Sequence, residues 1–127
     1  MRLVGIDYGA KRVGIAVSDE EGKFGLPYGV WLNTPDLVQN IKALCLEKRA
    51  DAIIVGESRN LDGSENPISS SINLLKTALE SELSIPIYLH PEFYTSAEAK
   101  RIQGENKMHD ASAAALILKS YIDQHSG

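Results

Sequence analysis

The sequence predicts an α/β fold in which a mixed five-stranded sheet, three antiparallel strands followed by parallel strands, is flanked by helices. Three observations predict it. The first quarter of the chain holds three short apolar runs rich in strand-forming residues and separated by turn residues. Two later apolar runs are continuous, which is typical of strands covered on both faces, and a helical pattern separates them. Two further helical patterns end the chain, so the expected order of elements is βββαβαβαα.

The antiparallel part begins with two strands, expected over residues 3–6 and 13–17. The turn between them, residues 8–12, contains a glycine, which suits a tight connection. Residues 25–27 have the sequence Gly-Leu-Pro and are expected to break the chain before a third strand over residues 28–32.

The first helix is expected to begin at Asn33 or Thr34, which would cap it, with Pro35 in its first turn. It should end near Lys48. Its buried face is given by apolar residues at helical spacing, namely Leu37, Ile41, Leu44 and Cys45.

The continuous apolar runs predict two parallel strands over residues 52–56 and 85–89. The segment between them should contain a polar loop, residues 57–67, and a helix whose apolar residues are Ile72, Leu75 and Leu79. A strand, a helix and a second strand in this order predict a right-handed parallel crossover.

The end of the chain predicts a short helix over residues 96–103 and a longer one over residues 110–122. The longer helix carries four alanines, which would let it lie close to the sheet. The chain shows no linker or internal repeat, so residues 1–127 are expected to form a single domain.

Composition narrows the class of protein. The chain has 127 residues, one cysteine and neither a signal-peptide pattern nor an apolar stretch of membrane-spanning length, so we expect a soluble cytoplasmic protein that makes no contact with membranes. The net charge of −4 does not by itself indicate binding to nucleic acid. Any nucleic acid would have to be held by a local basic patch, although carboxylates that bind a cation also add negative charge.

Three carboxylates stand where this architecture would bring them together. Asp7 ends the first strand, Glu92 follows the last strand across Pro91, and Asp110 opens the final helix. The carboxyl ends of parallel strands share one edge of the sheet, so the three side chains could bind metal jointly. Hydrolysis of a phosphodiester is well served by two Mg²⁺ or Mn²⁺ ions, with Asp7 as the bridging ligand.

Each acid also has an ordinary structural interpretation. An aspartate after a strand is usually a turn residue, as Asp7 would then be, and Asp110 before an alanine-rich helix suits an N-cap. Glu92 could be a solvated loop carboxylate. The spacing alone leaves these alternatives open.

The opening motif, residues 5–19, has the sequence GIDYGAKRVGIAVSD and closely resembles that of the bacterial YqgF family. Two further stretches agree, NLDGSE at residues 60–65 and DASAAALIL at residues 110–118. The members of this family are RNase H-like proteins described as Holliday junction resolvases and as nucleases of pre-16S ribosomal RNA.

The resemblance implies an RNase H-like nuclease with an acidic site at Asp7, Glu92 and Asp110. It also places Lys11, Arg12 and the loop of residues 60–65 beside a nucleic-acid substrate, either structured RNA or branched DNA. The residues expected to bind substrate are Lys11, Arg12, Arg59, Asn60 and Lys107. Whether the protein is a monomer or a homodimer is left open, since no interface is legible in the sequence.

The chain departs from the family pattern at three places. Glu57, Ser58 and Arg59 stand where the family commonly has Leu-Pro after its glycine, and Phe93 stands where an arginine is usual. The segment of residues 103–109 is short and lacks much of a basic stretch, which leaves Lys107 and His109 beside Asp110.

These departures motivate an alternative, a module of the same fold that binds nucleic acid or assembling ribosomes but cleaves weakly or not at all. A further interpretation, that the Asp-Tyr-Gly turn cradles a nucleotide phosphate as in sugar kinases, would need a second domain closing on the nucleotide.

Overall fold

The computed structural model describes residues 1–60, 69–94 and 107–125, and for residues 57–60, 69, 91–94 and 107–110 it describes the backbone alone. The short helix expected over residues 96–103 therefore lies outside the described residues.

The sheet has five strands in the order β3-β2-β1-β4-β5, so β3 and β5 are its two outer strands, the edge strands. The antiparallel pairs are β1 with β2 and β2 with β3, and the parallel pairs are β1 with β4 and β4 with β5, as the sequence predicts. The strands are β1 (Leu3–Asp7), β2 (Arg12–Ser18), β3 (Gly25–Leu32), β4 (Ala52–Asn60) and β5 (Ile87–Tyr94).

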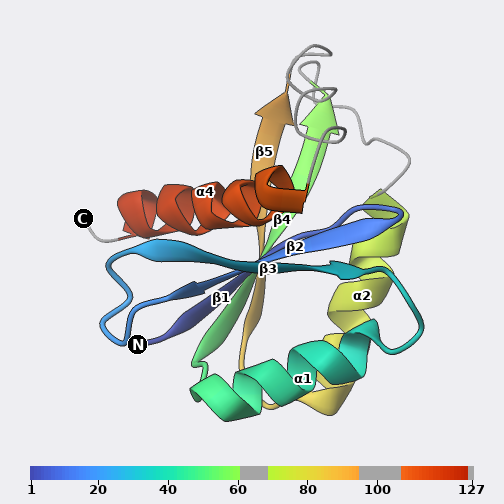
Figure 1. Cartoon of the computed structure of the whole chain (residues 1–127), viewed down its shortest axis with the longest axis horizontal. Coiled ribbons are helices and arrows are strands. Elements are labelled where there is room, and N and C mark those ends of the chain that lie inside the picture. The colour runs from blue at the N-terminus through green and yellow to red at the C-terminus, as the bar shows by residue number, and fades with distance from the viewer. Residues whose placement is uncertain (61–68, 95–106, 126–127) are drawn as a thin grey trace.

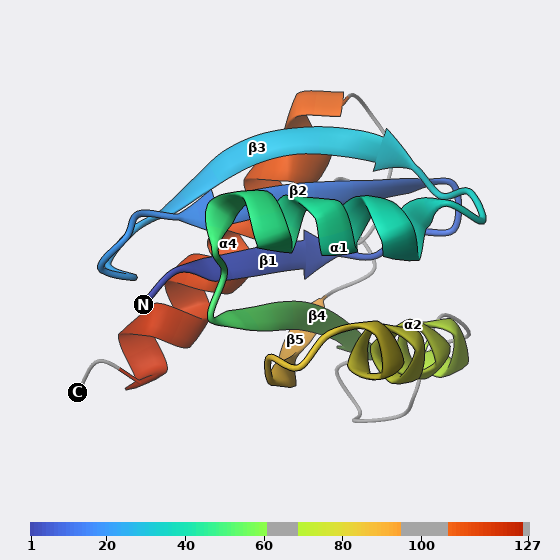
Figure 2. The ribbon, with the colours of Figure 1, turned by 90° about the horizontal axis from the view of Figure 1, so that it is seen from below.

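The helices cover the sheet on both faces (Figures 1 and 2). Two of them, α1 (Leu37–Lys48) and α2 (Ser69–Glu82), lie on one face and α4 (Lys107–His125) lies on the other. Alternation along β1 separates the two cores, because Val4 and Ile6 pack toward α1 and α2 whereas Leu3 packs toward α4.

Helix α4 lies unusually close to the strands beneath it. A Cβ atom added to Gly5 would stand 2.6 Å from Cγ of Leu118 and 3.0 Å from the carbonyl oxygen of Ala114. At Gly56 an added Cβ would collide with the side chain of Ile117. Glycines in the strands and alanines in the helix therefore let the backbones approach, which confirms the close packing expected from the alanine pattern.

Strands β4 and β5 are longer than expected, and this corrects the predicted position of Glu92. The pairing of β4 with β5 continues from Gly56 and His90 to Asn60 and Tyr94, so Glu92 lies inside β5 rather than after it. The sequence gives no signal for this extension, because the strands run on past the end of β1 and no longer need apolar residues on both faces. Pro91 is tolerated because β5 is an edge strand.

Two other boundaries differ from expectation. Strand β3 begins at Gly25, so the expected Gly-Leu-Pro break lies within it. Pro27 pairs with Ala16 beside a β-bulge on this edge strand, where a missing N–H donor is harmless. Helix α4 begins at Lys107, three residues earlier than expected, so Asp110 lies within its first turn and is not its N-cap.

Helix α1 begins at Leu37, later than Asn33 or Thr34, but Thr34 still acts as a cap for the turn that precedes it. Its hydroxyl accepts a hydrogen bond from the Asp36 N–H at 3.3 Å, and its carbonyl oxygen accepts one from the Leu37 N–H at 3.0 Å. Pro35 therefore lies in an irregular first turn, and the two descriptions differ by the usual uncertainty of a helix end.

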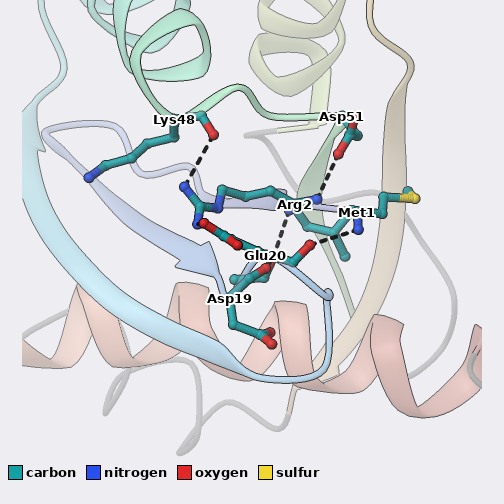
Figure 3. A network of polar contacts seen from close by, with 8 residues as sticks. Met1, Arg2, Asp19, Glu20, Lys48 and Asp51 are labelled. Carbon is teal, nitrogen blue, oxygen red and sulfur yellow. Dashed lines mark hydrogen bonds and ion pairs between the residues drawn. The ribbon is translucent and has the colours of Figure 1, made fainter.

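At the edge of the sheet where β1 begins, Arg2 joins three parts of the chain (Figure 3). Its guanidinium donates a hydrogen bond to the Lys48 carbonyl at 3.2 Å and pairs with the Glu20 carboxylate at 3.5 Å, while its backbone N–H donates to Asp51 at 2.8 Å. The N-terminal ammonium donates to the Glu20 carbonyl oxygen at 2.7 Å. This polar network ties the start of β1 to the segments that follow β2 and α1, at the side of the sheet opposite to the one where β1 ends.

Among the residues that the structure describes, none of the helices combines the length and the apolar character needed to span a bilayer.

Candidate active site

Asp7 is the last residue of β1 and is half-buried. Leu3 packs in the core under α4, and an added Cβ at Gly5 would meet α4 as well. Because alternate residues of a strand share a face, Asp7 lies on the α4 side of the sheet.

The turn that follows Asp7 is held by Asn33, which comes directly after β3. The Asn33 side chain donates a hydrogen bond to the Gly9 carbonyl oxygen at 2.9 Å, and its backbone N–H donates to the Lys11 carbonyl oxygen at 2.9 Å. The turn therefore has a defined shape, with Lys11 exposed at its end and Arg12 half-buried at the start of β2. Sequence reasoning treated Asn33 only as a possible helix cap.

The strand register relates Glu92 to Asp7. Ile6 pairs with Val55, which in turn pairs with Leu89, so Asp7 is one step further along, level with Gly56 and His90. Glu92 pairs with Ser58, two positions beyond that level, or about 7 Å along the strand direction. The backbone at Glu92 thus lies past the same edge at which β1 ends.

Helix α4 brings Asp110 toward this edge. The C-terminal end of α4 lies on the side of the molecule where β1 begins (Figures 1 and 2), and the Ala114 carbonyl lies over Gly5 in the middle of β1. The N-terminal end of α4 therefore lies toward the end of β1. Asp110 precedes Ala114 by one turn, about 6 Å along the helix axis.

The backbone accordingly brings the three predicted acids to one edge of the sheet. Among the predicted substrate-binding residues, Arg59 and Asn60 are the last two of β4, and Lys107 is the first of α4. The side chains of Glu92, Asp110, Arg59, Asn60 and Lys107 are outside the described part of the structure. Within the described part, no three histidine, cysteine or acidic side chains form a group able to hold a metal ion.

His90 was not singled out by its sequence and is, among the residues whose side chains the structure describes, the buried polar residue nearest to this edge. The residue is 4% exposed and its ring hydrogen-bonds the Ser120 hydroxyl at 2.9 Å, which ties β5 to α4. Burial lowers the pKa of His90, and the nearby charge of His125 lowers it further. The sequence signal is weak, since His90 simply continues the apolar run of residues 85–89.

Comparison with known proteins identifies relatives along nearly the whole chain. The family model described as "RuvX: Holliday junction resolvase" matches residues 1–124. A protein of Anaplasma marginale named "Putative pre-16S rRNA nuclease" is 30% identical over 99% of this chain and 87% of its own length. One of the same name from Novosphingobium aromaticivorans is 34% identical over 98% of this chain and 86% of its own.

Two solved structures show the same fold. RuvC of Thermus thermophilus in complex with a Holliday junction substrate has a TM-score of 0.64 at 16% identity, with 100% of this chain and 97% of that chain covered. The resolvase of fowlpox virus, solved with Holliday junction DNA, has a TM-score of 0.57 at 10% identity, with 98% of each chain covered. The fold is thus the RNase H-like fold of the resolvases, as the resemblance implied.

Proposed function

The chain belongs to the RuvX family of Holliday junction resolvases, also called the YqgF family, and we propose that it is a metal-dependent endonuclease of structured nucleic acid. The observation that carries the proposal is the position of Asp7 at the end of β1 on the α4 side, with the backbones of Glu92 and Asp110 at the same edge.

We assign the metal ligands to Asp7, Glu92 and Asp110. Glu92 stands two positions after His90, and alternate positions of a strand share a face, so a regular strand carries position 92 on the α4 side with Asp7. Position 110 shares a helix face with Ala114, which meets Gly5. A set of three carboxylates fits Mg²⁺ or Mn²⁺, which prefer oxygen ligands.

In this proposal the chain positions the reacting groups. Asp7, Glu92 and Asp110 would hold the metal, Asp7 from a central strand with neighbours on both sides and the other two acids from β5 and α4. Two Mg²⁺ ions, when bound, would activate a water, neutralise the non-bridging phosphate oxygens and help the leaving oxygen. The turn held by Asn33 presents Lys11 and Arg12 beside Asp7, where they contact substrate phosphates together with Arg59, Asn60 and Lys107.

Two substrates are consistent with this chemistry, the 5′ end of pre-16S ribosomal RNA and a Holliday junction. The names of the curated relatives support RNA, and the family description supports the junction. We favour RNA, because the relatives match with identities of 30 and 34% whereas the resolvase structures match with 16 and 10%. The proposal places the protein in the cytoplasm as one domain, and a junction substrate would additionally require a two-fold dimer.

The test is a cleavage assay on structured pre-rRNA and on four-way DNA junctions with Mg²⁺ or Mn²⁺. Asp7→Asn keeps the shape of the side chain and removes its charge, so we expect cleavage to fall by more than about tenfold, the smallest loss typical of residues that only support a metal ligand. Asp36→Asn is the matched control, because Asp36 is exposed beside α1 and makes no capping bond from its side chain.

Unchanged cleavage by Asp7→Asn would refute the metal mechanism. If wild type binds both substrates but cleaves neither with either metal, the alternative of a non-cleaving binding module is correct instead.

A further inference from the structure

Three ring side chains of β5 and α4 stack next to one another on the α4 side of the sheet. Tyr121 of α4 stacks on His125 with ring centroids 4.1 Å apart and an interplanar angle of 21°. Tyr88 of β5 lies nearly parallel to Tyr121, at 6.0 Å and 20°. We call Tyr88, Tyr121 and His125 the ring platform.

The ring platform is anchored at its central ring, and its other two rings are exposed. His90 is buried, is held by Ser120, and meets the Tyr121 ring edge-on at 6.1 Å and 83°. Tyr121, in the middle, is half-buried, whereas Tyr88 is 44% exposed and His125 is exposed. The central ring is thus fixed in orientation before any ligand arrives, which reduces the entropy lost on binding.

We propose that the ring platform stacks an unpaired nucleobase of the substrate strand; this inference rests on the proposed function, in that it takes the substrate to be nucleic acid. Nearly parallel rings with polar tips, of which Tyr88 and His125 are exposed, are suited to a flat, partly hydrated aromatic ligand. An aliphatic protein partner is a poorer fit, because all three rings carry polar atoms, namely the hydroxyl groups of Tyr88 and Tyr121 and the ring nitrogens of His125.

The location also suits a substrate strand. The platform is built from β5 and α4, the same two elements that carry Glu92 and Asp110. Tyr88 precedes Glu92 by four residues of one strand, about 13 Å. A single strand leaving a helical stem could therefore run along the β5 edge, with one base on the ring platform while the stem junction reaches the acidic edge.

The experiment measures binding without cleavage. Fluorescence anisotropy in EDTA compares an RNA hairpin that carries a short oligoadenosine tail with the same hairpin ending flush. Wild type should bind the tailed hairpin more tightly than the blunt one. Tyr88→Ala should weaken binding of the tailed hairpin by about fivefold or more, the loss of one stacked base, and leave the blunt hairpin unchanged. Tyr88→Phe should retain the wild-type affinity, since it keeps the ring.

Tyr28→Ala is the matched control, because Tyr28 is 46% exposed on the other edge strand, β3. The proposal is overturned if wild type shows no preference for the tail, if Tyr88→Ala binds like wild type, or if Tyr28→Ala loses as much. Because no metal is present, tail-dependent binding that survives in Asp7→Asn supports the ring platform even where the nuclease proposal fails. If the wild type cleaves in a metal-dependent way but Tyr88→Ala does not weaken binding of the tailed hairpin, the nuclease proposal stands and the ring platform proposal fails.

Discussion

Cys45 illustrates how a single side chain depends on its surroundings. It is 3% exposed in the core under α1, and burial raises the pKa of its thiol from 9.0 to about 11. Because the folded state holds the thiol proton more tightly than the unfolded state does, the raised pKa contributes to the free energy of unfolding. This contribution is complete below the unfolded pKa of 9.0 and is lost as the pH rises from about 9 to about 11.

We therefore expect wild type to lose up to about 2 kcal/mol of unfolding free energy over this window relative to Cys45→Ala. Urea denaturation of both proteins across the window measures the difference, and other alkaline titrations cancel because both chains share them. The cavity left by alanine adds an offset that does not vary with pH. A constant difference between the two proteins at every pH would contradict the assignment.

At the scale of elements, the fit of α4 on the sheet depends on glycine. Gly5→Ala places a methyl group against Leu118 and against the backbone carbonyl of Ala114, which cannot move without shifting the helix. We expect a loss of about 1 to 3 kcal/mol in unfolding free energy, measured by urea denaturation.

Gly29→Ala is the matched control in the same sheet, because an added Cβ there meets no atom within 4 Å and the backbone conformation is open to any residue. We expect it to be neutral or slightly stabilising. Equal destabilisation by both substitutions would show that the glycines act through strand propensity and not through the approach of α4.

The elements themselves were predictable to the extent that they bury apolar residues. Strands β1, β2 and the first half of β4 were recognisable because alternate or continuous apolar positions face packed helices. The C-terminal ends of β4 and β5 were missed because they are held by backbone hydrogen bonds to each other. Such pairing leaves no pattern of apolar residues in the sequence. The position of Glu92 inside β5 follows from that same omission.

At the scale of the whole molecule, the division of the sheet into antiparallel and parallel strands was predictable from the short turns and the crossover rule. The resemblance to a family supplied the identity of those acids, since the spacing alone left each an ordinary interpretation. The contacts of Asn33 with the Gly9 turn and of His90 with Ser120 could not be predicted, because they join residues distant in sequence through single polar groups.

The proposed site also makes a prediction about the stability of the whole molecule. Carboxylates gathered at one edge repel one another without a cation, so Asp7→Asn should raise Tm slightly in EDTA. A cation that binds only the folded state stabilises wild type by about 2.7 kcal/mol at a hundred times its dissociation constant, so Mn²⁺ should raise the wild-type Tm by several degrees. The two proteins should therefore exchange rank as Mn²⁺ is added.

Differential scanning calorimetry over a series of Mn²⁺ concentrations checks this crossing, with Asp36→Asn following wild type throughout because it leaves the acidic edge intact. Parallel shifts of wild type and Asp7→Asn would place the bound cation elsewhere on the surface. This measurement of Tm needs no substrate, so it distinguishes a protein that binds metal without cleaving nucleic acid from one in which the three carboxylates do not bind metal together. Only the second outcome removes the physical basis of the proposed chemistry.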